Sequence, residues 1–400
     1  MLRRDVPVPP LRRPIDRANR PATIPHSIER AVVLKRVLGI GIPAVIAGLA
    51  VALTLVLAQP APPTDEPYNF NLGKDITAEA ADVVINPRFK AVANDRFAYE
   101  CYYNATRTGV VSDGAEVVET FHNKEAWTTA FSLACTEDPL DGRKDLLVHV
   151  GIDMIEFSID NGDARYTGYI GQQTDMRKPG FKEILPDGKR NDVTNIPGWA
   201  GINSGALEAN RGTQATTYGG SACFNINDAG RIYNETYYAD WGNSDQTNYP
   251  GRLIEPLQLA LAVHPEFKDA AALKLGETLV VRRRLPVSAA RGSTIDYDVT
   301  YKLEKLYGTV AEPTAARLTF DAVPVQREHS QEVDGLVTKF TAPDIKGGKL
   351  LLDLVKGVAA WVSWEYRLSG TVTQPGTALS TAFDVKFDLT ASLREQKKPE

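Results

Sequence analysis

The residues with the clearest potential for chemistry in this chain are aromatic and polar side chains between positions 233 and 249. Flat rings alternate there with amides and carboxylates, which together could stack on a sugar ring and bond its hydroxyl groups. The candidate ligand-binding aromatics are Tyr237, Tyr238, Trp241 and Tyr249. A strand of aromatic residues followed by a polar loop has the same composition. The segment therefore predicts either a glycan-binding or glycan-cleaving site or an ordinary strand and loop.

Motifs for nucleophilic, metal or nucleotide chemistry are missing from the sequence. The nearest match to the nucleophile elbow G-x-S-x-G is residues 219–223, where Cys223 replaces the last glycine. No H-E-x-x-H, C-x-x-C or phosphate-binding glycine loop occurs, and His122, His149, His264 and His329 are scattered. The sequence predicts no catalytic residue, cofactor or metal, and so favours a protein that is not an enzyme.

Three cysteines, Cys101, Cys135 and Cys223, follow the apolar segment described below. An oxidising compartment permits one disulfide, and Cys101–Cys135 is the pair closest in sequence. By closing this loop, such a bridge would stabilise the folded state by about 4 kcal/mol in the chain-entropy model. The alternative is three reduced cysteines in the core.

Charge is distributed unevenly along the chain. Residues 1–36 hold nine of the 45 basic and three of the 50 acidic residues, so 36 basic and 47 acidic residues remain. An acidic body is a poor partner for nucleic acid. The first 36 residues also contain six prolines, which indicates a disordered basic tail.

One uncharged segment, Val37–Ala58, is long enough to cross a membrane as a helix. The basic flank lies wholly before it, so the positive-inside rule places the N-terminus in the cytoplasm and the rest outside. We expect a single-pass protein of the inner (cytoplasmic) membrane, contacting lipid through Val37–Ala58, with its body in the periplasm or extracellular space. The alternative is a signal peptide cleaved after Ala58. Residues 59–90 are expected to be a linker.

Strict alternation of apolar and polar residues predicts half-buried strands in the C-terminal half. The pattern is strongest in residues 295–304, 362–368 and 383–393. In the N-terminal half, residues 146–159 and 164–170 flank an Asn-Gly turn and predict a hairpin. Sheets with one wet face are typically antiparallel.

Two helices and one long loop are expected beside these strands. Residues 124–135 place Trp127, Phe131 and Ala134 on one helical face, and residues 251–264 carry a leucine stripe, with Pro256 in the first turn. Residues 171–220 show little periodicity and predict a long loop. The predicted domains are a first β-rich half, residues 91–265, and an antiparallel β second half, residues 266–400.

Short motifs in residues 224–394 resemble an uncharacterised group of bacterial extracytoplasmic β-rich proteins. They are the turn at residues 227–232, the His264-Pro265 helix end, the strand opening at Leu275-Gly276-Glu277, Gly347-Gly348 and Lys356-Gly357. In outline the pattern is similar to the clamshell of periplasmic lipoprotein and lipid carriers. The resemblance implies a mainly β fold of antiparallel sheets, open-barrel or clamshell-like, with a few helices. It implies no active site.

Three functions are compatible with these features. The leading one is a membrane-anchored extracytoplasmic binding or interaction module, as a subunit of an envelope or membrane complex. The second is a carrier of lipid or another apolar ligand, with a cavity lined by Leu257, Leu261, Trp364 and Phe387. The third is the glycan-binding or glycan-cleaving protein. The basic run at residues 282–284 is expected at a strand edge or partner contact.

Overall fold

The computed structural model describes nine stretches of the chain. They are residues 72–86, 88–137, 145–171, 181–193, 222–227, 232–237, 272–286, 294–333 and 335–394. All regular secondary structure in these stretches is strand, and every strand pairing is antiparallel. The mainly β, antiparallel class predicted from alternation is confirmed.

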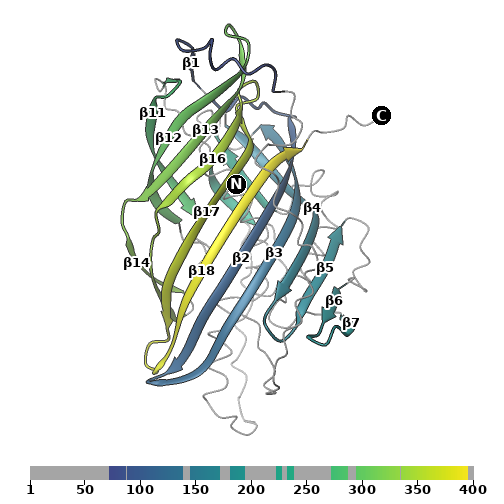
Figure 1. The fold of residues 1–400 in the computed structure, drawn as a ribbon, viewed down its shortest axis with the longest axis vertical. Helices are drawn as coiled ribbons and strands as arrows, with labels where there is room; N and C mark the ends of the chain where they lie inside the picture. Colours follow the sequence, from purple (N-terminus) through teal and green to yellow (C-terminus); the bar gives the residue numbers. More distant parts are fainter. Residues whose placement is uncertain are drawn as a thin grey trace, which may run out of the picture.

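Five long strands form the middle of the main sheet (Figure 1). In spatial order they are β17 (Val358–Thr373), β18 (Leu379–Arg394), β2 (Arg96–Asp113), β3 (Glu116–Glu137) and β4 (Leu146–Asp160). Because β18 pairs with β2 along its whole length, the C-terminal strand joins the first long strand directly. Both predicted halves of the chain therefore contribute to one sheet.

The sheet forks at β4. The C-terminal half of β4 pairs with β5 (Arg165–Gly171), and its N-terminal half pairs with β8 (Ala222–Ile226). The first branch continues through β6 (Phe181–Ile184) to β7 (Arg190–Val193), and the second ends at β9 (Ile232–Tyr237). The hairpin predicted around Asn161-Gly162 is confirmed as β4–β5, with Gly162 at a φ of 89°.

A second fork occurs at β17. Its first residues pair with β16 (Ile345–Asp353) and its last residues with β15 (Leu336–Thr341). The longer branch continues through β13 (Pro313–Pro324) and β12 (Thr294–Gly308) to β11 (Thr278–Pro286), and the shorter branch ends at β14 (Glu328–Val333). No pairing between the described strands joins the two ends of the path, β11 and β7.

One face of this sheet, called the inner face below, carries the hydrophobic core. In β18, Phe383, Val385, Phe387 and Leu389 are buried while the residues between them are exposed or half-buried. All the long strands contribute buried side chains to one continuous cluster, and a second, smaller cluster consists of Ala315, Leu351, Ala360 and Trp361. Burial of alternate residues is what stabilises a sheet with one wet face, at about 25 cal/mol per Å² of apolar surface.

Large aromatic rings on the inner face fit only where a residue beside them has no side chain. A Cβ added to Gly168 would lie 2.5 Å from Phe157 and 2.6 Å from Phe181. These two rings contact each other edge to face, with centroids 5.5 Å apart. Glycine at this position therefore lets the aromatic rings of neighbouring strands meet.

The segment that precedes the long strands packs across one end of the sheet. Ile76 N–H donates to Leu306 O over 3.0 Å, and Lys90 N–H donates to Lys356 O over 3.1 Å. β1 (Val84–Ile85) pairs with β10 (Leu273–Lys274) to form a separate small sheet. The described part of residues 59–90 thus belongs to the folded body, which corrects its prediction as a linker.

The predicted helix at residues 124–135 is wrong, since this segment lies within β3. The spacing of Trp127, Phe131 and Ala134 fits a helix, but every odd-numbered residue from Glu125 to Cys135 is buried, and of the residues between them only two alanines are buried as well. Pairing with β2 on one side and β4 on the other overrides the local pattern.

The predicted loop at residues 171–220 contains two short strands, β6 and β7. The predicted helix at residues 251–264, the basic tail and the apolar segment Val37–Ala58 lie outside the described residues. Within the described stretches, no helix has the length and apolar character needed to cross a membrane.

Candidate functional site

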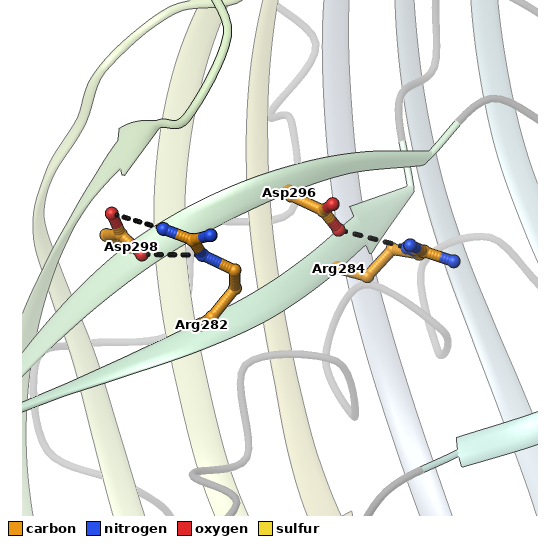
Figure 2. Close-up of polar contacts among 4 residues, drawn as sticks. All are labelled: Arg282, Arg284, Asp296 and Asp298. Atoms are coloured by element: carbon orange, nitrogen blue, oxygen red, sulfur yellow. Dashed lines mark hydrogen bonds and ion pairs between the residues drawn. The ribbon is translucent and has the colours of Figure 1, made fainter.

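A ladder of two ion pairs lies on the outer face of the sheet, where β11 ends one branch (Figure 2). The Arg282 guanidinium binds the Asp298 carboxylate through two hydrogen bonds, Nε to Oδ1 over 2.9 Å and Nη2 to Oδ2 over 3.1 Å. Arg284 Nε donates to Asp296 Oδ1 over 3.0 Å. We call these four side chains the edge ladder.

The alternation of β11 and β12 explains the edge ladder. Register places Arg282 opposite Asp298 and Arg284 opposite Asp296, with all four side chains on the solvent side. Arg283 lies between them on the inner face and is only 6% exposed. The run of three arginines, which was predicted at a strand edge or partner contact, therefore lies on the strand that ends this branch of the sheet. Two of its side chains point to the outer face and one to the inner face.

The electrostatics of the edge ladder favour the charged forms. The hydrogen bond and charge of Asp298 raise the pKa of Arg282, and Arg282 in turn lowers the pKa of Asp298. Asp296 raises the pKa of Arg284 in the same way. All four side chains are at least 44% exposed, so solvent screens the pairs and they add little stability. The two guanidinium groups lie one after the other along the outer face of β11.

A second arginine–carboxylate pair lies on the opposite, inner face. Arg107 Nε donates to Glu125 Oε1 over 2.9 Å, and Arg107 Nη2 donates to the Tyr103 hydroxyl over 2.9 Å. The side chains of Arg107 and Glu125 are only 13% and 2% exposed. Sequence reasoning missed this pair, because the two residues are 18 positions apart on different strands and only the β2–β3 register brings them together.

Polar groups continue from Glu125 along the same row of the inner face. Register aligns Glu125 with Ile159 on β4, Tyr166 on β5 and Glu183 on β6. Tyr166 Oη donates to Glu183 Oε1 over 3.1 Å, and Asn191 Nδ2 donates to Glu183 Oε2 over 2.9 Å. Burial, followed by the hydrogen bond and charge of Glu183, raises the pKa of Tyr166 to about 12.

The predicted Cys101–Cys135 disulfide is not formed, and both thiols are free and buried. Cys101 lies opposite Thr129, and Cys135 is six residues further along β3. That distance is about 20 Å at ~3.4 Å per residue, whereas a disulfide needs Cα atoms within about 7 Å. Burial raises the pKa of both thiols, that of Cys135 to about 12, so neither is a reactive thiolate.

The predicted sugar-binding aromatics are not assembled by the described residues. Tyr237 is the last residue of β9, and its side chain is not described. Tyr238, Trp241 and Tyr249 lie outside the described residues. The glycan site therefore stays a prediction.

The predicted apolar cavity is described only in part. Trp364 and Phe387 are buried on the inner face with ring centroids 6.5 Å apart, and Tyr103 and Tyr366 lie 4.5 and 4.9 Å from Phe387. Leu257 and Leu261 lie outside the described residues. The aromatic side chains thus pack directly on one another. Trp364 Nε1 is buried and has no hydrogen-bond partner among the described residues.

Metal chemistry has no candidate site in the part of the chain that the structure describes. No group of three or more His, Cys, Asp or Glu side chains is placed there to hold an ion. Of the histidines, His329 stacks on Phe340 at 5.2 Å, and His149 Nε2 lies 3.2 Å from the Thr136 hydroxyl.

Comparison with known proteins shows no family for this chain. No protein-family model and no curated protein matches its sequence. Among solved structures, a BenF-like porin from Pseudomonas fluorescens Pf-5 aligns at 8% identity over 76% of this chain and 99% of its own, with a TM-score of 0.14. OccK11 (OpdR) of Pseudomonas aeruginosa aligns at 7% identity over 78% of this chain and 100% of its own, with a TM-score of 0.15. TM-scores this low do not establish a shared fold.

Proposed function

We propose that this chain is a membrane-anchored extracytoplasmic interaction module, which acts as a subunit of an envelope or membrane complex. The observation that carries the proposal is the edge ladder, an ordered and exposed row of charges on a strand that ends the sheet. Exposed ion pairs contribute little to folding, so their ordered arrangement at an edge suits recognition of a partner.

The sequence supports the location of this module. The apolar segment Val37–Ala58 is long enough to span the bilayer, and the basic residues before it favour a cytoplasmic N-terminus. The wet outer face agrees with a body in aqueous surroundings, because long strands such as β18 alternate buried and exposed side chains.

Two measurements on the full chain test the proposal. Alkaline phosphatase fused after Glu400 should be active and green fluorescent protein fused there should be dark, since only the former works outside the cytoplasm. Native mass spectra of the protein purified gently from its own membrane should show defined assemblies with other polypeptides. A fluorescent C-terminal fusion, or a protein that is always alone, would contradict the proposal.

A carrier of apolar ligand is the second candidate, and Trp364 is the observation that favours it. Its buried indole N–H has no hydrogen-bond partner among the described residues, which costs free energy, and the carbonyl or ester oxygen of a bound lipid could accept that hydrogen bond. The same native mass spectra test this candidate. An added mass of lipid size that disappears in Trp364→Phe would support it, whereas a body free of small molecules would exclude it.

A further inference from the structure

We infer that the edge of β11 on which no described strand lies receives an extended strand from a partner polypeptide, in which acidic residues alternate with apolar residues. The inference rests on the proposed function and names the docking site and the partner's chemistry. β11 has nine residues, whereas the other strands that end a branch, β7, β9 and β14, have four, six and six. It therefore offers the longest open edge among the described strands.

The backbone of β11 offers hydrogen-bonding groups in a regular row. Leu303 N–H donates to Glu277 O, so the backbone groups of odd-numbered residues point toward β12. Bonding alternates along an antiparallel pair, and the N–H and C=O groups of Val280, Arg282 and Arg284 therefore point away from β12. Pro286, which has no N–H, falls on the outward side at the end of this row.

Two side chains on the inner face of β11, Leu279 and Val281, lie where no described strand covers the outer side of β11, whereas Arg283 and Leu285 further along the same face are buried. Leu279 and Val281 pack against the core but are only partly buried, unlike Val299 and Tyr301 opposite them, which are fully buried. A further strand with apolar residues at alternate positions would cover Leu279 and Val281 as cross-strand neighbours do.

The charges on the outer face of β11 indicate which residue type should alternate with the apolar residues of the partner strand. Exposed charges on an edge strand normally oppose pairing, but Asp298 and Asp296 compensate Arg282 and Arg284 here. Arginine has five N–H donors, and Arg284 uses one of them on Asp296. An acidic side chain on the added strand would meet these guanidinium groups. A second copy of β11 carries no acidic residue, so it offers no carboxylate to the remaining guanidinium donors.

A synthetic peptide tests the inference on the full chain in detergent. A fluorescent octapeptide of alternating Glu and Val should bind in an anisotropy titration, while alternating Lys and Val, and a block of four Glu followed by four Val, should not. Hydrogen exchange resolved to single residues should show new protection at the amides of Val280, Arg282 and Arg284 alone. Equal binding of all three peptides would overturn the inference.

Two variants of one residue separate the backbone from the side chain. Val280→Pro removes an outward N–H that no described strand uses, and should weaken binding of the Glu–Val peptide by about tenfold or more. Val280→Ala keeps the N–H and should bind as the parent does. Equal urea midpoints show that both variants fold.

The outcome distinguishes this inference from the function on which it rests. If Val280→Pro keeps its partner polypeptides in native mass spectra and also binds the peptide, the interaction module stands and docking at β11 is overturned. If Val280→Pro instead converts a dimer of this chain to a monomer, the edge pairs with a second copy and the acidic partner is overturned.

Discussion

The two faces of the sheet use the same chemistry in opposite ways. On the outer face, Arg282 and Asp298 form a bidentate pair that is 60% and 44% exposed. On the inner face, Arg107 and Glu125 form a pair that is 13% and 2% exposed. Water screens the outer pair but not the inner pair. Losing one partner should therefore cost little stability on the outer face and much more on the inner face.

This comparison predicts its largest effect for Arg107→Met. The substitution leaves the Glu125 carboxylate buried without its cation, and should lower the free energy of unfolding by about 3–5 kcal/mol. Urea unfolding of the full chain followed by tryptophan fluorescence measures the change. The double variant with Glu125→Leu should recover most of the loss, because it removes both charges. A single variant as stable as the parent would show that the inner pair is solvated.

Tyr166→Phe should have a smaller effect that depends on pH. It removes a hydrogen bond to Glu183 worth about 1.5 kcal/mol at neutral pH. The pKa of Tyr166 is about 12 in the folded state and about 10 in an unfolded chain, so the unfolded state loses its proton first as pH rises. The stability that Tyr166 adds is therefore full below pH 10 and lost between about pH 10 and 12. The difference in Tm between parent and variant should shrink over that range, and a constant difference would contradict the assignment.

Shortening one aliphatic side chain on each face tests apolar packing in the same comparison, with one carbon removed on the inner face and two on the outer face. Ile155 is fully buried on β4, and Ile155→Val should cost about 1 kcal/mol. Val280 is 60% exposed on β11, and Val280→Ala should change stability by less than about 0.5 kcal/mol. Urea midpoints of the two variants give the ratio of the two losses in stability. Equal losses would mean that the outer face is covered in the intact protein.

The smallest effect is expected for Arg282→Gln. Both partners of the pair are exposed, so its loss should leave the Tm almost unchanged, and 1 M salt should abolish any difference. Because Asp298 has a lowered pKa, its contribution is present above about pH 4 and disappears as pH falls further. Melting curves at low and high salt measure this, with Arg367→Gln, which breaks a similar pair with Asp384, as the matched control.

The sequence by itself determined the β class of the fold and, in the regularly alternating strands, which residues face inward. Strands such as β12, β17 and β18 follow alternation with a period of two, and that period depends only on the geometry of an extended chain. The basic run at residues 282–284 was predicted at a strand edge or partner contact, and β11 is an edge strand among the described strands.

Only the tertiary structure decided which residues meet. Register, which no local pattern encodes, separates Cys101 from Cys135 and joins Arg107 to Glu125. Residues 124–135 form a strand because they pair on both sides, although their spacing also fits a helix. β6 and β7 form by pairing as well, in a segment whose sequence shows no periodicity. Such contacts depend on free energies of packing between distant segments, and these exist only once the sheet has formed.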